Sequence, residues 1–220
     1  MNKKHNSKIE WRFIYLKLTR KEREKLRKNQ EIIEASIKVF SEKGFYEATM
    51  HDIANAVEMG VGTLYQYFKS KDDLYYNAIL YKLNEFHDFY EEKIRGKTTF
   101  LDILSAMISA WIEYFGRNND FFAIVFSEWI NVKKTFARKL KHRLTSEFTE
   151  KYDDIIKLME QGKQAGEIKD GTNTGILGSM IFGAIQHIIH MGAMKKEPVS
   201  STLVAENIIT ILSSGILNSK

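Results

Sequence analysis

The chain of 220 residues contains no cysteine and only one proline, and these two scarcities narrow its possible folds and chemistries. Without cysteine, the chain cannot form a disulfide, a thiolate nucleophile or a thiolate metal site, and this composition fits the reducing cytoplasm. One proline among many strong helix formers favours an all-helical protein. The length allows one large domain, or a small domain followed by a larger one.

The chain also lacks an N-terminal apolar run that ends in small residues, so we expect no secretory signal. A different segment lacks charge: no charged residue occurs between Asp170 and Lys195, a stretch about long enough to span a bilayer. A lone membrane span would expose the imidazoles of His187 and His190 to lipid. We therefore interpret the segment as a buried helix at a subunit interface, and expect no stable membrane insertion.

Small residues spaced by four along this segment would let a second helix approach closely. The residues that this interpretation places at a homodimer interface are Gly175, Ser179, Phe182, Gly183, Gln186, His187 and His190.

Positive charge is concentrated at the start of the chain. Residues 1–28 hold eleven Lys/Arg and three Glu, a net of +8, so the formal charge of +5 leaves −3 for residues 29–220. A protein that meets phosphate at one end would have such a distribution, although a solubilising tail would also have it. For residues 1–18 the pattern leaves four alternatives open: a DNA-contacting arm, a membrane-surface anchor, a packing segment or a flexible one.

Two short helices are predicted around residue 60. Thr49 and Asp52 have the spacing of a capping box, so a helix should begin at Met50, and its apolar residues recur at helical spacing. A second short helix should run through Leu64 and Phe68. Two short helices joined by a tight turn form a helix-turn-helix, whose second helix can enter the DNA major groove.

This stretch resembles the tetracycline-repressor (TetR/AcrR-type) family of bacterial transcriptional regulators. The matching residues are Ala35, Phe40, Gly44, Phe45, Thr49, Asp52, Ile53, Ala54, Gly62, Thr63, Leu64, Tyr65, Tyr67, Phe68, Ser70, Lys71 and Leu74. The resemblance implies an all-α fold, with an N-terminal homeodomain-like helix-turn-helix head and a C-terminal helical bundle for ligand binding and dimerisation. We expect a basic extension over 1–26, a DNA-binding domain over 27–73 and a ligand-binding and dimerisation domain over 74–220.

Three residues depart from the family pattern in the turn. Glu58 stands where the family usually has glycine, Gly60 where it usually has a capping serine or threonine, and Val61 where a polar or basic residue is common.

The candidate DNA contacts lie on the second short helix and its flanks. Thr49 and Lys71 stand at helix N-termini, where positive charge and backbone N–H groups favour phosphate. Gly60 and Gly62 would let the backbone approach the duplex, and Thr63 could hydrogen-bond base edges. The complete set is Thr49, Gly60, Val61, Gly62, Thr63, Tyr65, Gln66, Tyr67 and Lys71.

The remainder of the chain reads as a helical bundle. We expect helices over 100–115, about 120–131, a long one ending near Gly162, and two final helices over about 174–194 and 201–217. Aromatic residues in the middle helices are typical of a core, but the family resemblance implies a ligand cavity there. The candidate pocket residues are Phe86, Trp111, Tyr114, Phe115, Phe122, Phe126 and Trp129.

The sequence contains no phosphate-cradling glycine pattern, no hydrolase-type serine motif and no histidine cluster that we would assign to a metal, so we expect neither enzyme activity nor a cofactor. We therefore predict a homodimeric transcriptional regulator. The family resemblance implies a repressor, which a small, largely apolar ligand, hydrophobic or aromatic, would release from a palindromic operator. The alternatives are a membrane-surface protein that uses the basic N-terminal segment and, less favoured, an enzyme.

Overall fold

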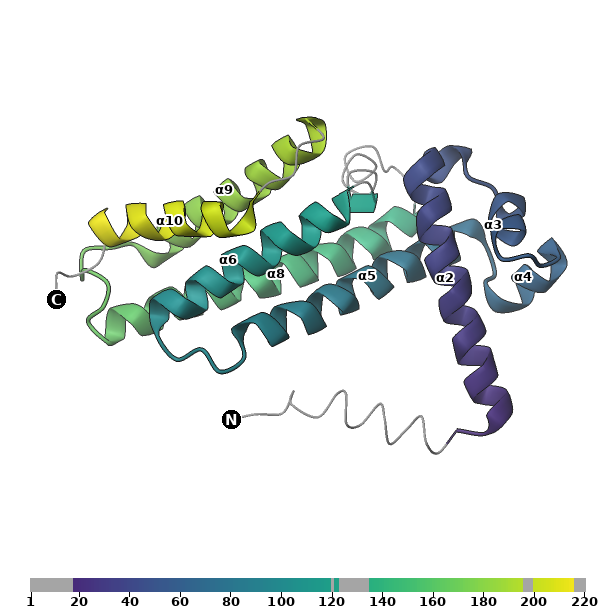
Figure 1. Cartoon of the computed structure of the whole chain (residues 1–220), viewed down its shortest axis with the longest axis horizontal. Coiled ribbons are helices and arrows are strands. Elements are labelled where there is room, and N and C mark those ends of the chain that lie inside the picture. The colour runs from purple at the N-terminus through teal and green to yellow at the C-terminus, as the bar shows by residue number, and fades with distance from the viewer. Residues whose placement is uncertain (1–17, 120, 123–134, 196–199, 216–220) are drawn as a thin grey trace. The chain divides into compact units, whose positions relative to one another are not determined.

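The computed structural model describes residues 18–119, 121–122, 135–195 and 200–215, and the elements that form in these ranges are all helices (Figure 1). The all-helical prediction is therefore confirmed. The chain divides into two compact units, residues 1–78 and 79–220, which we call the head and the body.

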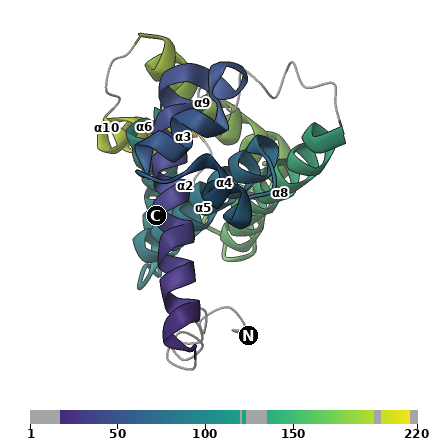
Figure 2. The same cartoon turned by 90° about the vertical axis from the view of Figure 1, so that its right-hand side faces the viewer.

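The described part of the head, from residue 18 onward, contains three helices and the start of a fourth. They are α2 (Arg20–Glu47), α3 (Met50–Ala56), α4 (Val61–Tyr67) and the first two turns of α5 (Lys71–Ile94). Helix α3 packs against both α2 and α4 (Figure 2). The side chains that are fully buried in the head include Ile32, Phe40, Ile53, Leu64 and Leu74.

Helix α2 begins where side-chain oxygens satisfy the backbone N–H groups of its first turn. Thr19 and Glu22 form a capping box: the Glu22 N–H donates to Thr19 Oγ1 at 3.3 Å, and the Thr19 N–H donates to Glu22 Oε2 at 2.8 Å. Near its other end α2 is interrupted at Gly44, whose φ of 75° is easily adopted only by glycine. Three further helical residues, 45–47, follow this kink.

Aromatic rings join the end of α2 to the beginning of α5. The Tyr75 ring lies 4.9 Å from that of Phe40 and 4.8 Å from that of Phe45, centroid to centroid. Edge-to-face and offset pairs of this kind contribute about 0.5–1.5 kcal/mol beyond the area they bury. This cluster fixes the position of the Gly44 kink against α5.

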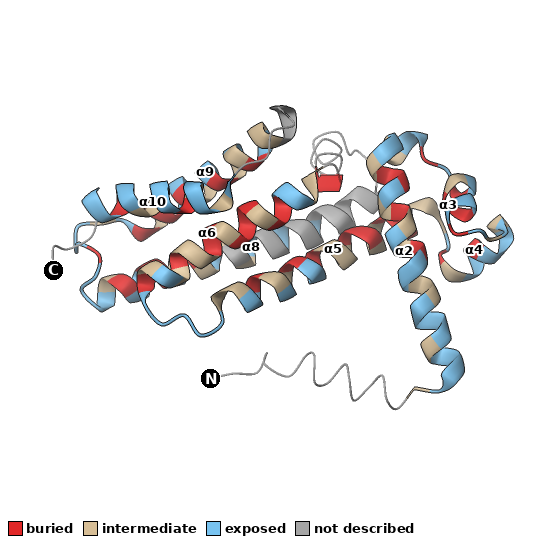
Figure 3. Ribbon diagram, viewed as in Figure 1, coloured by how far each residue is buried: buried red, intermediate tan, exposed pale blue. Residues whose placement is uncertain are grey.

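The described residues of the body form the rest of α5 together with α6 (Phe100–Arg117), α8 (Thr135–Gln164), α9 (Thr174–Lys195) and α10 (Ser201–Gly215). Helix α6 packs against α9 and α10, and α8 packs against α9. Buried residues line α6 along most of its length (Figure 3). These bounds agree with the predicted helices; most of the helix expected near 120–131 lies outside the described residues, as do residues 1–17.

A close approach between α8 and α9 occurs at Gly178. A Cβ atom placed at this residue would lie only 2.2 Å from Ile156 Cδ1, so glycine is what allows the two helices to come this near. Gly178 was not part of the predicted stripe of small residues. At the stripe's own glycines no other helix comes this near: a Cβ atom at Gly183 would have nothing within 4 Å, and one at Gly175 would meet only Asn173 Oδ1 at 3.4 Å.

Candidate functional site

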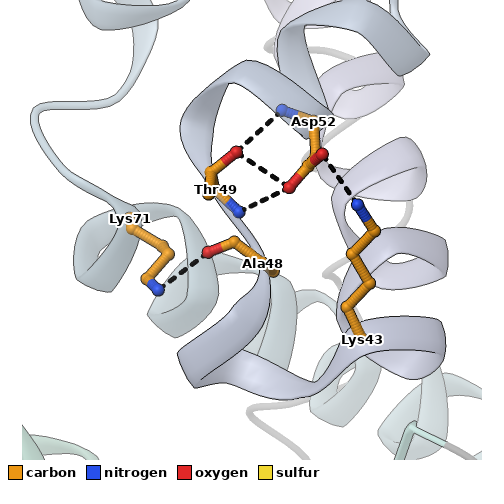
Figure 4. A network of polar contacts seen from close by, with 5 residues as sticks. All are labelled: Lys43, Ala48, Thr49, Asp52 and Lys71. Carbon is orange, nitrogen blue, oxygen red and sulfur yellow. Dashed lines mark hydrogen bonds and ion pairs between the residues drawn. The ribbon is translucent and has the colours of Figure 1, made fainter.

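The first short helix of the head is held at its beginning by a three-residue network (Figure 4). Thr49 Oγ1 accepts the Asp52 N–H at 3.1 Å, and Asp52 Oδ2 accepts the Thr49 N–H at 2.9 Å. Lys43 Nζ donates to Asp52 Oδ1 at 2.7 Å. The hydrogen bond from Lys43, followed by those from Thr49, lowers the pKa of the Asp52 carboxyl to about 2. The predicted capping box at Thr49 is confirmed.

The turn between α3 and α4 forms although its residue 58 is not glycine. Glu58 adopts φ 51°, which is the left-handed region that the family's usual glycine would occupy without strain. The turn is closed by the Met59 N–H, which donates to the Ala54 carbonyl at 2.9 Å. Gly60 then caps α4 through its backbone alone, with no side-chain hydrogen bond to the helix. The departures from the family pattern therefore leave the turn intact.

Helix α4 buries one side and exposes the other. Leu64 is fully buried, and Phe68, just after the helix, is nearly so. Gly62, Thr63, Tyr65 and Gln66 are exposed, whereas Val61 and Tyr67 are half-buried. A Cβ atom at Gly62 would have nothing within 4 Å, so the chain itself does not require glycine there.

The exposed face of α4 is polar but uncharged. The helix, VGTLYQY, contains no Lys, Arg, Asp or Glu. Hydroxyl and amide groups of the kind it presents can donate to or accept from base edges in a groove. The face can thus distinguish hydrogen-bonding patterns, but it offers no cation to phosphate.

Lys71, at the start of α5, is used within the head. Its ammonium donates to the Ala48 carbonyl at 2.8 Å and to the Tyr46 carbonyl at 3.1 Å, and it lies 4.6 Å from the centroid of the Phe45 ring. Because an ammonium has three N–H donors, one remains for a phosphate oxygen. The predicted phosphate contact of Lys71 would therefore be an additional function of a side chain that already stabilises the head.

The predicted pocket residues in the described part of the body form one buried aromatic cluster. The Phe86 ring lies 5.0 Å from Trp111, 5.2 Å from Tyr114 and 5.1 Å from Phe115, and the Phe115 ring lies 4.5 Å from Phe122. All five side chains are buried. Phe126 and Trp129 lie outside the described residues. The structure thus brings five of the seven predicted residues together.

Tyr114 gives this cluster its one described polar link to α5. Its hydroxyl donates to the Lys82 carbonyl at 2.6 Å and lies 3.2 Å from Glu85 Oε2. Burial, followed by the nearby Glu85 carboxylate, raises the pKa of the Tyr114 hydroxyl, so this group stays a hydrogen-bond donor in alkaline solution as well as at neutral pH.

The predicted interface residues of α9 lie on two different faces. Gly183, His187 and His190 are exposed, and nothing lies within 4 Å of a Cβ at Gly183. By contrast, the Phe182 ring packs within the chain, 5.4 Å from Trp111 and 5.7 Å from Tyr152. The Tyr152 hydroxyl is also hydrogen-bonded to Ser179 Oγ at 2.8 Å and to the Gly175 carbonyl at 3.3 Å; Gln186 is half-buried.

Four large apolar side chains missed by the sequence analysis are exposed on the last two helices. Ile176 and Met180 on α9 are 62% and 66% exposed, and Leu203 and Ile211 on α10 are 59% and 70% exposed. Helix α9 is also long and apolar enough to cross a membrane by length and composition, and 28% of its apolar window, Thr174–Gly192, is buried. In the described part of the chain, no group of three or more His, Asp or Glu is placed to hold a metal ion.

Two family patterns match the chain. The one described as "Bacterial regulatory proteins, tetR family" matches residues 32–77, and "YsiA-like protein, C-terminal region" matches residues 80–215. The chain is also similar to the fatty acid metabolism regulator protein of Bacillus subtilis, with 26% identity over 197 residues, which are 89% of this chain and 99% of that protein.

Solved structures are similar over most of the chain. The transcriptional regulator FadR from Bacillus subtilis, in complex with stearoyl-CoA, matches with a TM-score of 0.69 and 25% identity, covering 85% of this chain and 98% of that one. A TetR transcriptional regulator from Chloroflexus aurantiacus matches with a TM-score of 0.75 at 16% identity, covering 90% and 100%. The second likeness concerns the fold alone.

Proposed function

The chain belongs to the tetR family of bacterial regulatory proteins, and we propose that it is a homodimeric, cytoplasmic repressor that an acyl-CoA-type ligand releases from a palindromic operator. The DNA-binding and regulatory part of this proposal is supported by the match of family patterns to both units, residues 32–77 in the head and 80–215 in the body. DNA-binding regulation follows from the family; the operator symmetry, the sign of regulation and the ligand are our inferences.

The exposed face of α4 supports its role in reading the operator. Thr63 and Gln66 carry groups that can hydrogen-bond base edges, and Val61 can contact a thymine methyl. The open space around Gly62 supports a close approach of the α4 backbone to the duplex. The aromatic hydroxyl of exposed Tyr65 would then contact phosphate or sugar, which positions the helix without specifying sequence.

The exposed apolar residues of α9 and α10 support dimerisation through these helices. Ile176, Met180, Leu203 and Ile211 would be removed from water if the two helices paired with their copies in a four-helix arrangement. Burying one such side chain contributes about 1.5–3 kcal/mol. In a twofold dimer, the two heads would reach successive major grooves, roughly 34 Å apart. The dimer would therefore read a palindromic operator.

The ligand class follows from the body and from the names of similar proteins. One relative is named for fatty acid metabolism, and one similar structure contains stearoyl-CoA. In this chain the buried rings around Phe86 and Trp111 offer an apolar environment that suits an alkyl chain. We therefore propose a long-chain acyl thioester, whose chain would enter between these rings and favour a conformer in which the heads no longer match the operator spacing.

Operator release tests the ligand proposal. A labelled operator duplex, selected with the purified protein, would be titrated with the full chain in the presence of stearoyl-CoA, stearate or coenzyme A. Allosteric coupling of about 1–3 kcal/mol predicts that stearoyl-CoA weakens operator binding about 5–150-fold, while coenzyme A alone has no effect. Equal weakening of operator binding by all three compounds, or no weakening by any of them, would contradict an acyl-CoA-type ligand. Neither result would affect the DNA-binding assignment.

A further inference from the structure

The helix-turn-helix region of this chain has the wrong net charge to attract DNA by itself. Residues 29–78 contain four Lys/Arg and eight Asp/Glu, a net of −4, so the negative charge of the chain beyond residue 28 lies in the head. Helix α4 is uncharged, Lys43 is paired with Asp52, and Lys71 already donates to two carbonyls. Because the phosphate backbone dominates DNA affinity and only the exposed Lys38 and Lys69 remain in this region, most of the cations must come from elsewhere.

The first turns of α2 hold six of the eleven Lys/Arg of residues 1–28. Arg20–Lys28 contains six Lys/Arg and two Glu, and it precedes residue 32, where the tetR family pattern begins to match. These turns are mostly exposed. Two of the six cations are occupied by nearby carboxylates: Arg20 pairs with Glu24 at 2.9 Å and Lys28 with Glu31 at 2.9 Å.

The other four cations lie on two sides of the helix, with the lysines on one side and the arginines on the other. In the described part of the chain no carboxylate pairs with Lys21, Arg23, Lys25 or Arg27. At about 100° per residue, the two lysines fall on the side that Ile32 and its buried neighbours occupy further along, which is the side turned toward the rest of the head. Arg23 and Arg27 fall on the opposite side.

We propose that Lys21 and Lys25 contact duplex phosphates outside the groove that α4 occupies, and that α2 provides the electrostatic part of DNA binding while α4 reads bases with neutral groups. This inference rests on the proposed DNA-binding function. It assigns affinity and sequence preference to different helices: the basic turns of α2 attract any duplex, and the exposed face of α4 selects among duplexes.

Two double variants with the same charge change test the assignment. Lys21→Gln/Lys25→Gln removes the lysines on the side of the head, and Arg23→Gln/Arg27→Gln removes two cations from the opposite side. Binding of each full chain to the selected operator and to a random-sequence duplex would be measured against salt concentration. Each lost phosphate contact lowers the slope of log K against log salt by about 0.9, so the lysine variant should lose about 1.8 on both duplexes.

The salt slope of the arginine variant should fall by less than half as much as that of the lysine variant. Cations that do not touch the duplex are screened over a Debye length of about 10 Å at 0.1 M salt. The ratio of operator to random-duplex affinity should stay the same in both variants. Equal slope losses in the two variants, or none in either, would overturn the proposed contacts. Thermal melting checks that both variants remain folded.

Anionic lipid is the other polyanion that this surface could meet. Flotation with vesicles containing phosphatidylserine would be run on the same proteins. Loss of vesicle binding in the lysine variant with an unchanged DNA slope would assign the surface to a membrane and overturn the proposal. If the wild-type chain selects no operator at all, the proposed function fails, yet the slope on the random-sequence duplex still decides between the two sides of α2.

Discussion

Lys71 Nζ donates a hydrogen bond of 2.8 Å to the carbonyl oxygen of Ala48, across 23 positions of sequence (Figure 4). The bond joins the first turn of α5 to the residue that precedes the Thr49 cap of α3. It therefore holds the start of α3 against the start of α5 within the head. A lysine that the sequence marks only as a phosphate ligand is thus also part of the internal structure of the head.

Replacing Lys71 should affect both stability and DNA binding. Lys71→Ala removes two charge-assisted hydrogen bonds from a partly buried group, so we expect the free energy of unfolding to fall by about 1–2 kcal/mol. Affinity for operator and random duplexes should fall together. Lys69→Ala is the matched control, because the Lys69 side chain is exposed: it should lower the salt slope without changing thermal stability. A Lys71→Ala protein with unchanged melting would contradict the structural role.

Gly62→Ala should separate stability from DNA binding. Alanine is a better helix former and meets no atom of the chain within 4 Å, so the head should gain about 0.5 kcal/mol in unfolding free energy. The added methyl group would nevertheless collide with a closely approaching duplex, and we expect about tenfold weaker operator binding. Gly116→Ala, at an equally open helical position of the body, should leave operator binding unchanged. Undiminished affinity in Gly62→Ala would show that the α4 backbone stays away from the DNA.

Acid should destabilise the cap of α3. The pKa of Asp52 is lowered from 3.8 to about 2 in the folded head, so the carboxylate contributes stability above pH 3.8 that is lost as the pH falls through about 2. The melting temperature of the wild-type chain should therefore fall as the pH is lowered across this interval. Asp52→Asn should melt at a lower temperature at neutral pH and show a shallower decrease in acid. Parallel pH profiles for the two proteins would contradict the role of this carboxylate.

Two glycines of α9 should respond differently to the same substitution. Gly183 is exposed and open, so Gly183→Arg should give folded monomers in light scattering, because the new charge would lie in the proposed dimer interface. Gly178 faces Ile156 at close range, so Gly178→Arg should disrupt the packing of α8 against α9 and lower the helical content. A dimeric Gly183→Arg protein would move the interface to another surface.

The ends of the helices could be predicted from sequence because they depend on local chemistry. The capping boxes at Thr19 and Thr49 and the hydrogen bond of 3.1 Å from the Asp73 N–H to Ser70 Oγ all join residues three apart. Such pairs can be recognised without knowledge of the fold. The order and approximate bounds of the body helices followed for the same reason, from apolar periodicity within each helix.

The faces of α9 could not be predicted in the same way. The helix is apolar on nearly all sides, so its sequence does not distinguish the residues that pack within the chain from those that remain exposed. Phe182 packs on Trp111, whereas Met180, two positions earlier, is exposed. Partners distant in sequence, such as Lys71 and Ala48, also escape any local pattern, because only the fold brings them together.

Selection of bound fragments from the source genome by the purified full-length protein tests the central claim most directly. The account predicts an enriched inverted repeat with half-sites about one helical turn apart, bound by a dimer whose affinity falls in the presence of stearoyl-CoA. Recovery of fragments with no shared sequence, or of a site read by a single subunit, would contradict it.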